Sequence, residues 1–276
     1  MGKCLIARLY DSLSNDDSLS LGELRLSSQN KDTGNLIQVI ANKKIRLKVI
    51  GDTGAFVDNV SGSELSVIDI EANTLKTVRT KNLSEFSIIQ KYGLTFLNVP
   101  NSFVVDLSLL KYTNINDLNL SAATGNLSSL KKLELTKLFL PSGVEGSINS
   151  LNISNATNIK IIGKGITGDV GMFKDSRNIV TIELYNTNIT GDISVFKNCT
   201  NLTNIKIFDS AISGNVEDLV NGLISAGKTS GEIRFNYPNR TNVNFQGTPL
   251  KSSSYTGWNC VIKWDNSNIT IINKNY

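Results

Sequence analysis

Apolar residues recur through the middle of the chain in the pattern L-x-x-L-x-L, in which Leu, Ile or Ala fills each fixed position. The last two positions flank one outward residue, which predicts a short strand with both apolar side chains on one side. Because the pattern repeats, the strands are expected to stack into a parallel sheet over a shared core. The copies are Ile115/Leu118/Leu120, Leu130/Leu133/Leu135, Ala156/Ile159/Ile161, Ile179/Ile182/Leu184 and Leu202/Ile205/Ile207.

A glycine motif sets the period of the repeat. Gly168, Gly191 and Gly214 are spaced 23 residues apart, and Gly146 lies 22 residues before Gly168. Each of these glycines has Ile or Val two residues before it and two residues after it. This period falls within the range of about 20–29 residues that is typical of leucine-rich repeats.

The chain therefore resembles leucine-rich-repeat proteins, and its Ile-x-Gly-x-Ile segment is similar to the LxGxIP segment of the plant type. That resemblance implies a second extended segment after each turn. Two departures are visible: the proline is missing from every copy, and the family's asparagine-ladder position holds Lys164, Thr187 and Ser210.

The two ends of the chain break the repeat. Alternating apolar residues in 1–60, in the runs Leu5/Ala7/Leu9, Leu24/Leu26 and Ile45/Leu47/Val49, predict a small β domain. Residues 61–110 carry irregularly spaced triplets, interpreted as degenerate repeats, with chance in an apolar β-rich sequence as the alternative. These triplets are Leu65/Ile68/Ile70, Leu75/Val78/Thr80, Leu83/Phe86/Ile88 and Leu94/Leu97/Val99.

Towards the C-terminus, the helical spacing of Val216, Leu219, Val220, Leu223 and Ile224 predicts a capping helix near 216–226. Trp258 to Trp264 and Asn268 to Ile272 predict a C-terminal hairpin. We therefore expect a mainly β protein with a few short helices. A small N-terminal β domain, residues 1–60, is followed by a leucine-rich-repeat-type solenoid with an irregular start over 61–276.

Composition removes several classes of function. The 276 residues include no histidine, the commonest general base and metal ligand. Cys4, Cys199 and Cys260 are far apart and odd in number, so we expect free thiols, no metal and no cofactor. The net charge of +4 is spread without a basic tract, which argues against nucleic-acid binding. We also expect no signal peptide and, because no apolar stretch approaches about 18 residues, no membrane span.

One apparent nucleotide-binding motif is rejected because the elements predicted around it come in the wrong order. Residues 222–229 satisfy the phosphate-loop expression GxxxxGK[ST]. A working phosphate loop follows a strand and begins a helix. Here the helical period comes first and a strand, residues 231–235, comes after. We therefore predict a helix end with Gly227 as its left-handed cap.

Five residues form the candidate binding surface. Asp169 and Asp192 occupy equivalent repeat positions and are expected to lie about one coil apart, roughly 4.8 Å, as solvated turn residues. A weak calcium or sugar contact is the alternative. Tyr185 and Phe208 each follow the last core residue of a predicted strand and could form a stripe with Tyr237, while packing between coils is the other interpretation.

A second resemblance concerns the source of the chain. Residues 3–9 and 21–26 resemble the start of virion and fibre-type proteins of Bacteroides-infecting phages, including crAss-like phages, and 216–235 resembles repeat ends in leucine-rich proteins of those phages and their hosts. The resemblance implies a virion component assembled in the bacterial cytoplasm: a head fibre, capsid-decorating protein or tail fibre.

In such a component the N-terminal region would attach to other virion proteins. The solenoid would present a surface to a host surface protein or glycan, and a homotrimer is expected by analogy with fibres. The function expected is therefore structural and adhesive, without catalysis. An intracellular bacterial interaction module is the alternative.

Overall fold

The chain forms two compact units, Met1–Val104 and Val105–Tyr276. The computed structural model describes residues 23–49, 55–58, 64–65, 67–89, 91–99, 103–236, 242–245, 248–249, 258–265 and 268–273. The division lies between Val104 and Val105, so the boundary expected near residue 60 is too early. Each unit is described by itself.

The N-terminal unit is an antiparallel sheet with the strand order β7-β1-β6-β2-β5, and β3 pairs with β4 and β6. The strands predicted around Leu24 and over Ile45 to Val49 are confirmed, whereas Leu5 to Leu9 lies outside the described residues. The elements are β1 (Glu23–Ala41), β2 (Ile45–Val49), β3 (Ala55–Asp58), β4 (Glu64–Leu65), β5 (Val67–Ile70), β6 (Lys76–Ile89), the 3₁₀ helix η1 (Lys91–Gly93) and β7 (Leu94–Val99).

The irregular triplets between Leu65 and Ile88 fall on β4, β5 and β6 of this antiparallel sheet or on the loop between β5 and β6, so their interpretation as degenerate repeats is wrong. Leu94, Leu97 and Val99 are buried in β7 with the spacing of a coil strand, as that interpretation expects. Strand β6 runs for 14 residues and pairs antiparallel with the 19-residue β1. Both strands are far longer than those of one solenoid coil. An alternating apolar pattern specifies which face of a strand is buried but not the direction of its partner.

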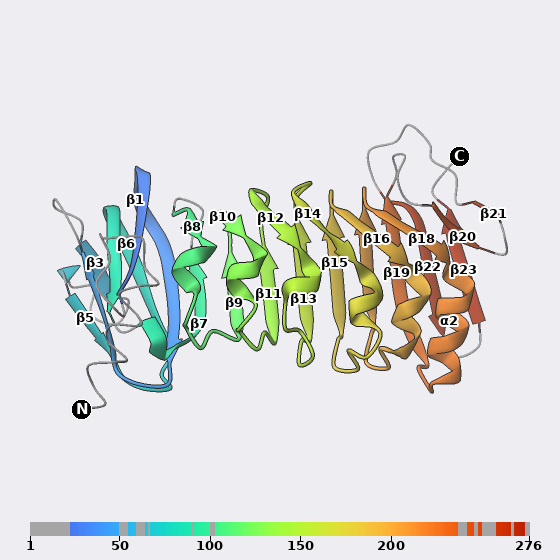
Figure 1. Ribbon diagram of the computed structural model, residues 1–276. Coiled ribbons are helices and arrows are strands. Elements are labelled where there is room, and N and C mark those ends of the chain that lie inside the picture. The colour runs from blue at the N-terminus through green and yellow to red at the C-terminus, as the bar shows by residue number, and fades with distance from the viewer. Residues whose placement is uncertain are drawn as a thin grey trace, which may run out of the picture. The chain divides into compact units, whose positions relative to one another are not determined.

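The C-terminal unit is built from coils that each contribute a strand to two sheets (Figure 1). The first sheet is parallel and in register, so that Leu138 pairs with Ile159, Ile159 with Ile182 and Ile182 with Ile205. Its strands are β9 (Asp117–Leu120), β11 (Lys137–Leu140), β13 (Asn158–Ile162), β15 (Thr181–Tyr185), β17 (Asn204–Phe208) and β19 (Ser230–Asn236).

The second sheet contains the second extended segment that the glycine motif implied. Its strands are β8 (Val105–Asp106), β10 (Ala123–Asn126), β12 (Val144–Ser147), β14 (Ile166–Asp169), β16 (Asn188–Asp192), β18 (Ala211–Asn215) and β20 (Asn242–Phe245), all parallel, with β21 (Thr248–Pro249) antiparallel at the end.

Short 3₁₀ helices close the third side of each coil; the sequence predicted a few short helices but not their positions in the coils. They are η2 (Leu107–Leu110), η3 (Leu127–Leu130), η4 (Ile148–Ser150), η5 (Val170–Phe173) and η6 (Ile193–Asn198).

Each coil buries apolar side chains from all three sides. In one coil Ile159 and Ile161 come from the first sheet, Ile166 from the second, and Val170 and Phe173 from the 3₁₀ helix; all five are at most 1% exposed. Removing this apolar surface from water is the main source of stability, and every coil shares it with its neighbours.

One repeat was framed wrongly from the sequence. Leu130, Leu133 and Leu135 are buried, but they lie at the end of η3 and in the turn that follows. The strand is β11, where Leu138 and Leu140 are the buried pair. Two overlapping L-x-x-L-x-L frames occur here, and the parallel register with β9 and β13 selects the second.

The C-terminal end of the solenoid has the two elements predicted for it, in a different arrangement. The helix α2 (Val216–Ser225) packs on η6 at the end of the row of short helices (Figure 1). Beyond β19, the first sheet is continued by the antiparallel hairpin β22 (Trp258–Asp265) and β23 (Asn268–Asn273). The hairpin, and not the helix, therefore covers the end of this sheet.

Candidate functional site

Outward side chains of β9, β11, β13, β15, β17 and β19 form one surface, named here the sheet face. Its centre is an ion network that crosses three strands. The Glu183 carboxylate lies 2.5 Å from Lys206 Nζ and 3.7 Å from Lys160 Nζ, and it accepts a hydrogen bond from the Tyr185 hydroxyl at 3.1 Å. A second cluster joins Glu232 to Arg234 and to Lys263, the latter at 3.1 Å.

Partial burial and charge together set the ionisation of this network. Burial raises the pKa of Glu183, but hydrogen bonds donated by Lys206 and Tyr185, together with the charges of Lys206 and Lys160, outweigh it and hold that pKa below its usual value. Burial and the neighbouring Glu183 carboxylate raise the pKa of Tyr185. The carboxylate is therefore ionised and the phenol neutral near neutral pH.

The two candidate aromatics on this surface lie together. Tyr185 and Phe208 end β15 and β17 in register, and their ring centroids are 5.0 Å apart with the planes tilted by 32°. Both side chains are half-buried, so they pack between coils and remain partly open to solvent. Tyr237, the third member of the expected stripe, lies outside the described residues.

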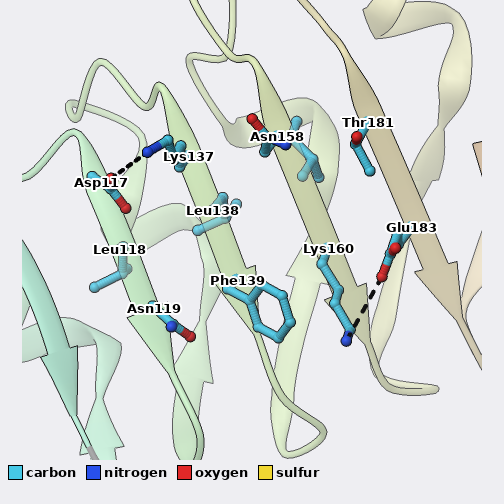
Figure 2. Close-up of a pocket in the computed structure, with 11 residues that line it drawn as sticks. Asp117, Leu118, Asn119, Lys137, Leu138, Phe139, Asn158, Lys160, Thr181 and Glu183 are labelled. Carbon is cyan, nitrogen blue, oxygen red and sulfur yellow. Dashed lines mark ion pairs between the residues drawn. The ribbon is translucent and has the colours of Figure 1, made fainter. Parts of the chain in front are cut away.

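A hollow opens on the same face over β9, β11, β13 and β15 (Figure 2). Its volume is about 430 Å³, within the range of small-molecule sites. Figure 2 shows the Phe139 ring between Asn119 and Lys160, with the Lys137–Asp117 ion pair towards one end. Lys160 Nζ lies 4.3 Å from the centroid of the Phe139 ring and 5.5 Å from that of Tyr185.

Asp169 and Asp192 lie on the second sheet, so the structure does not bring them to the sheet face. Each caps a 3₁₀ helix: Asp169 Oδ1 accepts from the Gly171 amide at 2.6 Å, and Asp192 Oδ1 accepts from the Ser194 amide at 2.7 Å. The same role is filled in other coils by Asp106, Asn126, Ser147 and Asn215. A residue with an oxygen at this position satisfies an orphan amide of the helix start.

The phosphate-loop expression at residues 222–229 is a helix end, as predicted. Helix α2 stops at Ser225, Gly227 has φ +87°, and the Gly227 and Lys228 amides donate to the carbonyls of Ile224 and Leu223. Strand β19 follows. The carbonyl end of the helix therefore points to this turn, which is the opposite polarity from a phosphate site.

No group of three or more Cys, Asp and Glu side chains in the described part of the chain is placed to hold a metal ion. Cys199 is fully buried, and its thiol donates to the Phe173 carbonyl at 3.4 Å. Burial raises the pKa of this thiol to about 12, with a smaller effect from Asp175. Such a thiol is unreactive as a nucleophile. Within the described segments, no helix is long and apolar enough to span a membrane.

Neither a family model nor a curated protein matches the sequence. Similar solved structures include the plant peptide hormone receptor RGFR1 in complex with RGF2, at 18% identity and a TM-score of 0.36, covering 54% of this chain and 23% of the receptor chain. Internalin C2 from Listeria monocytogenes is 15% identical with a TM-score of 0.33, covering 57% of this chain and 83% of the internalin.

These likenesses are too distant to bear on function, and the strand registers decide the architecture. It is a leucine-rich-repeat-type solenoid. In place of the family's asparagine ladder, a row of capping residues follows the motif glycines in the solenoid. Thr187 and Ser210, at the ladder position, are almost fully buried.

The sequence did not reveal the hollow or the ion network. Phe139 and Lys160 are missing from the predicted surface because its aromatic members lie at strand ends, whereas these two residues lie in the middle of their strands. For Phe139 the frame error in β11 is a second cause. The signal that would have found it is the spacing of 21 residues between Leu138 and Ile159, which continues the repeat period.

Proposed function

We propose that this chain is a non-enzymatic recognition protein that engages its partner through the sheet face. One observation carries the proposal: the outward side chains of successive coils are joined to each other across the strands. Lys160, Glu183 and Lys206 form one network, and the rings of Tyr185 and Phe208 stack beside it. Such a surface is held in place before a partner arrives, which lowers the entropic loss on binding.

The carboxylates that could have suggested catalysis have another role. Asp169 and Asp192 are engaged with backbone amides as helix caps. Glu183 is saturated by two ammonium groups and a phenol, so it lacks the raised pKa of a general acid. This arrangement favours recognition over chemistry.

We further propose that the chain is a phage virion protein, in which the N-terminal unit attaches to the particle and the solenoid faces the host. The support is the resemblance of residues 3–9, 21–26 and 216–235 to virion and fibre-type proteins and to repeat ends in phage and host proteins. The solenoid fits either this role or that of a bacterial interaction module, so the particle itself provides the test.

The experiment uses the phage whose genome encodes the chain. Mass spectrometry and antibody labelling of purified particles are expected to find the chain on their surface, and its absence from the particles would overturn the virion role in favour of the interaction module.

The sheet face is tested by competition. Excess purified chain is expected to reduce adsorption of the particles to host cells. A Tyr185→Ala/Phe208→Ala variant that stays folded by circular dichroism should not compete. Asp169→Asn, on the other sheet, is the matched control and should compete like the wild-type chain. Equal competition by all three proteins would place recognition elsewhere on the molecule.

A further inference from the structure

The hollow around Phe139 is separate from the Tyr185–Phe208 stack and has its own chemistry. Phe139 is the one large apolar side chain that is exposed, at 38%, among the described residues of the C-terminal unit. It occupies an outward position in the middle of β11. A single exposed ring is common on protein surfaces, but this one lines a hollow of about 430 Å³ together with polar side chains, a combination typical of ligand sites.

Each charged side chain that lines the hollow forms an ion pair with another lining residue. Asp117 pairs with Lys137 at 3.2 Å, and Lys160 pairs with Glu183 at 3.7 Å. The lining residues thus contribute two positive and two negative charges. A charged ligand would have to displace an existing partner, whereas an uncharged ligand would not.

Three polar side chains of the lining are available for new hydrogen bonds. The amides of Asn119 and Asn158 and the hydroxyl of Thr181 have no side-chain hydrogen bond to any other residue in the described part of the chain. An amide offers two donors and one acceptor oxygen, and a hydroxyl offers both roles. Asn119 lies beside the Phe139 ring, and Asn158 and Thr181 lie next to each other towards the Lys137 end of the hollow (Figure 2).

We infer that this hollow binds an uncharged oligosaccharide: the apolar face of one sugar ring stacks on Phe139 beside Asn119, and the hydroxyl groups of a neighbouring sugar bond to Asn158 and Thr181. Lys160 covers one side of the Phe139 ring, so the sugar uses the side nearer Asn119 (Figure 2). The inference rests on the proposed recognition by the sheet face and names the ligand class.

A peptide fits this place less well. Strands β11 and β13 are hydrogen-bonded to a neighbour on each side, so no strand edge is open for an added peptide strand. The hollow is also open and carries no net charge, which leaves nothing to select an acidic or basic peptide. The mixture of one ring with several amides and hydroxyls suits a polyhydroxylated ring better.

The test is titration of the full chain with uncharged oligosaccharides from an array, followed by calorimetry with those that bind. Phe139→Leu is expected to weaken binding about tenfold. Asn158→Ala, an exposed position, is expected to weaken it about fivefold. Asp169→Asn, on the second sheet and outside the lining, is the control and should leave affinity unchanged. Affinity should be the same at low and high salt, because no ion pair forms.

Each other outcome overturns the inference. The inference fails if no uncharged saccharide binds at millimolar concentration, or if Phe139→Leu leaves binding intact. It also fails if binding weakens steeply with salt, or if peptides bind at Phe139 instead. If saccharides fail while the Tyr185→Ala/Phe208→Ala variant still loses competition for host cells, recognition by the sheet face stands without this ligand. If the wild-type chain also fails to compete for host cells, the proposed function falls.

Discussion

Replacing Gly191 with alanine tests how one coil rests on the next. Gly191 has φ +109°, and a Cβ added there would lie 2.7 Å from Asp169 Oδ1 and 2.8 Å from Val170 Cγ2. Asp169 Oδ1 is also the acceptor that caps η5 through the Gly171 amide. The substitution therefore strains the backbone and pushes the cap of the preceding coil out of position.

The loss of stability follows from these two contributions. Holding a side chain in that backbone region costs about 1–3 kcal/mol, and loss of a cap adds about 1 kcal/mol. For a unit of this size each kcal/mol shifts the thermal midpoint by roughly 2–4 °C. We expect Gly191→Ala to lower the unfolding midpoint, followed by circular dichroism, by roughly 10 °C.

Gly227→Ala is the matched control. Its φ is +87°, but a Cβ there would meet nothing within 4 Å, so only the backbone strain applies. A fall of roughly 6 °C is expected. In a cycle of single and double variants, Asp169→Ala should also cost less when Gly191 is already alanine. Equal midpoints for the two glycine variants, or an additive cycle, would refute the reasoning.

Four further outcomes are expected. With the other two cysteines changed to serine, Cys199 should react with a thiol reagent far more slowly in the folded chain than after unfolding, because its pKa is raised to about 12; fast labelling would contradict its burial. The stabilising effect of Glu183 over Glu183→Gln should be full at neutral pH and be lost as pH falls through the folded pKa of Glu183, which lies below its usual value; a pH-independent difference in melting midpoint would count against the network. Asp169→Asn should change stability by under about 0.5 kcal/mol, since asparagine caps other coils, while Asp169→Ala costs about 1 kcal/mol; equal losses in urea unfolding would remove the capping role. Thr187→Val should leave stability unchanged or raise it by up to about 1 kcal/mol, because the buried Oγ1 has no hydrogen bond within the described residues; a clear loss would show a hidden partner.

The repeat could be predicted from the sequence because each coil is specified by residues that are close together in the chain. Apolar residues at two alternating positions, then a turn, then Ile-x-Gly-x-Ile, specify one strand of each sheet from fewer than 25 neighbouring residues. The helix end at Gly227 was local in the same way. The antiparallel N-terminal sheet was not, because β1 and β6 meet only through long-range pairing that an alternating pattern leaves open.

Strand register also explains why the binding surface predicted from the sequence differs from the surface in the structure. Asp169 and Tyr185 both looked exposed and periodic, yet one ends a strand of the second sheet and the other a strand of the first. The sequence pattern predicts the strand of this coil at Leu133 and Leu135, which leaves Phe139 outside it. A shift of five residues turns Phe139 from a loop residue into the centre of β11, opposite Asn119 and Lys160. Since cross-strand neighbours decide which side chains can act together, a site on a repeat surface becomes predictable only once the frame of every coil is known.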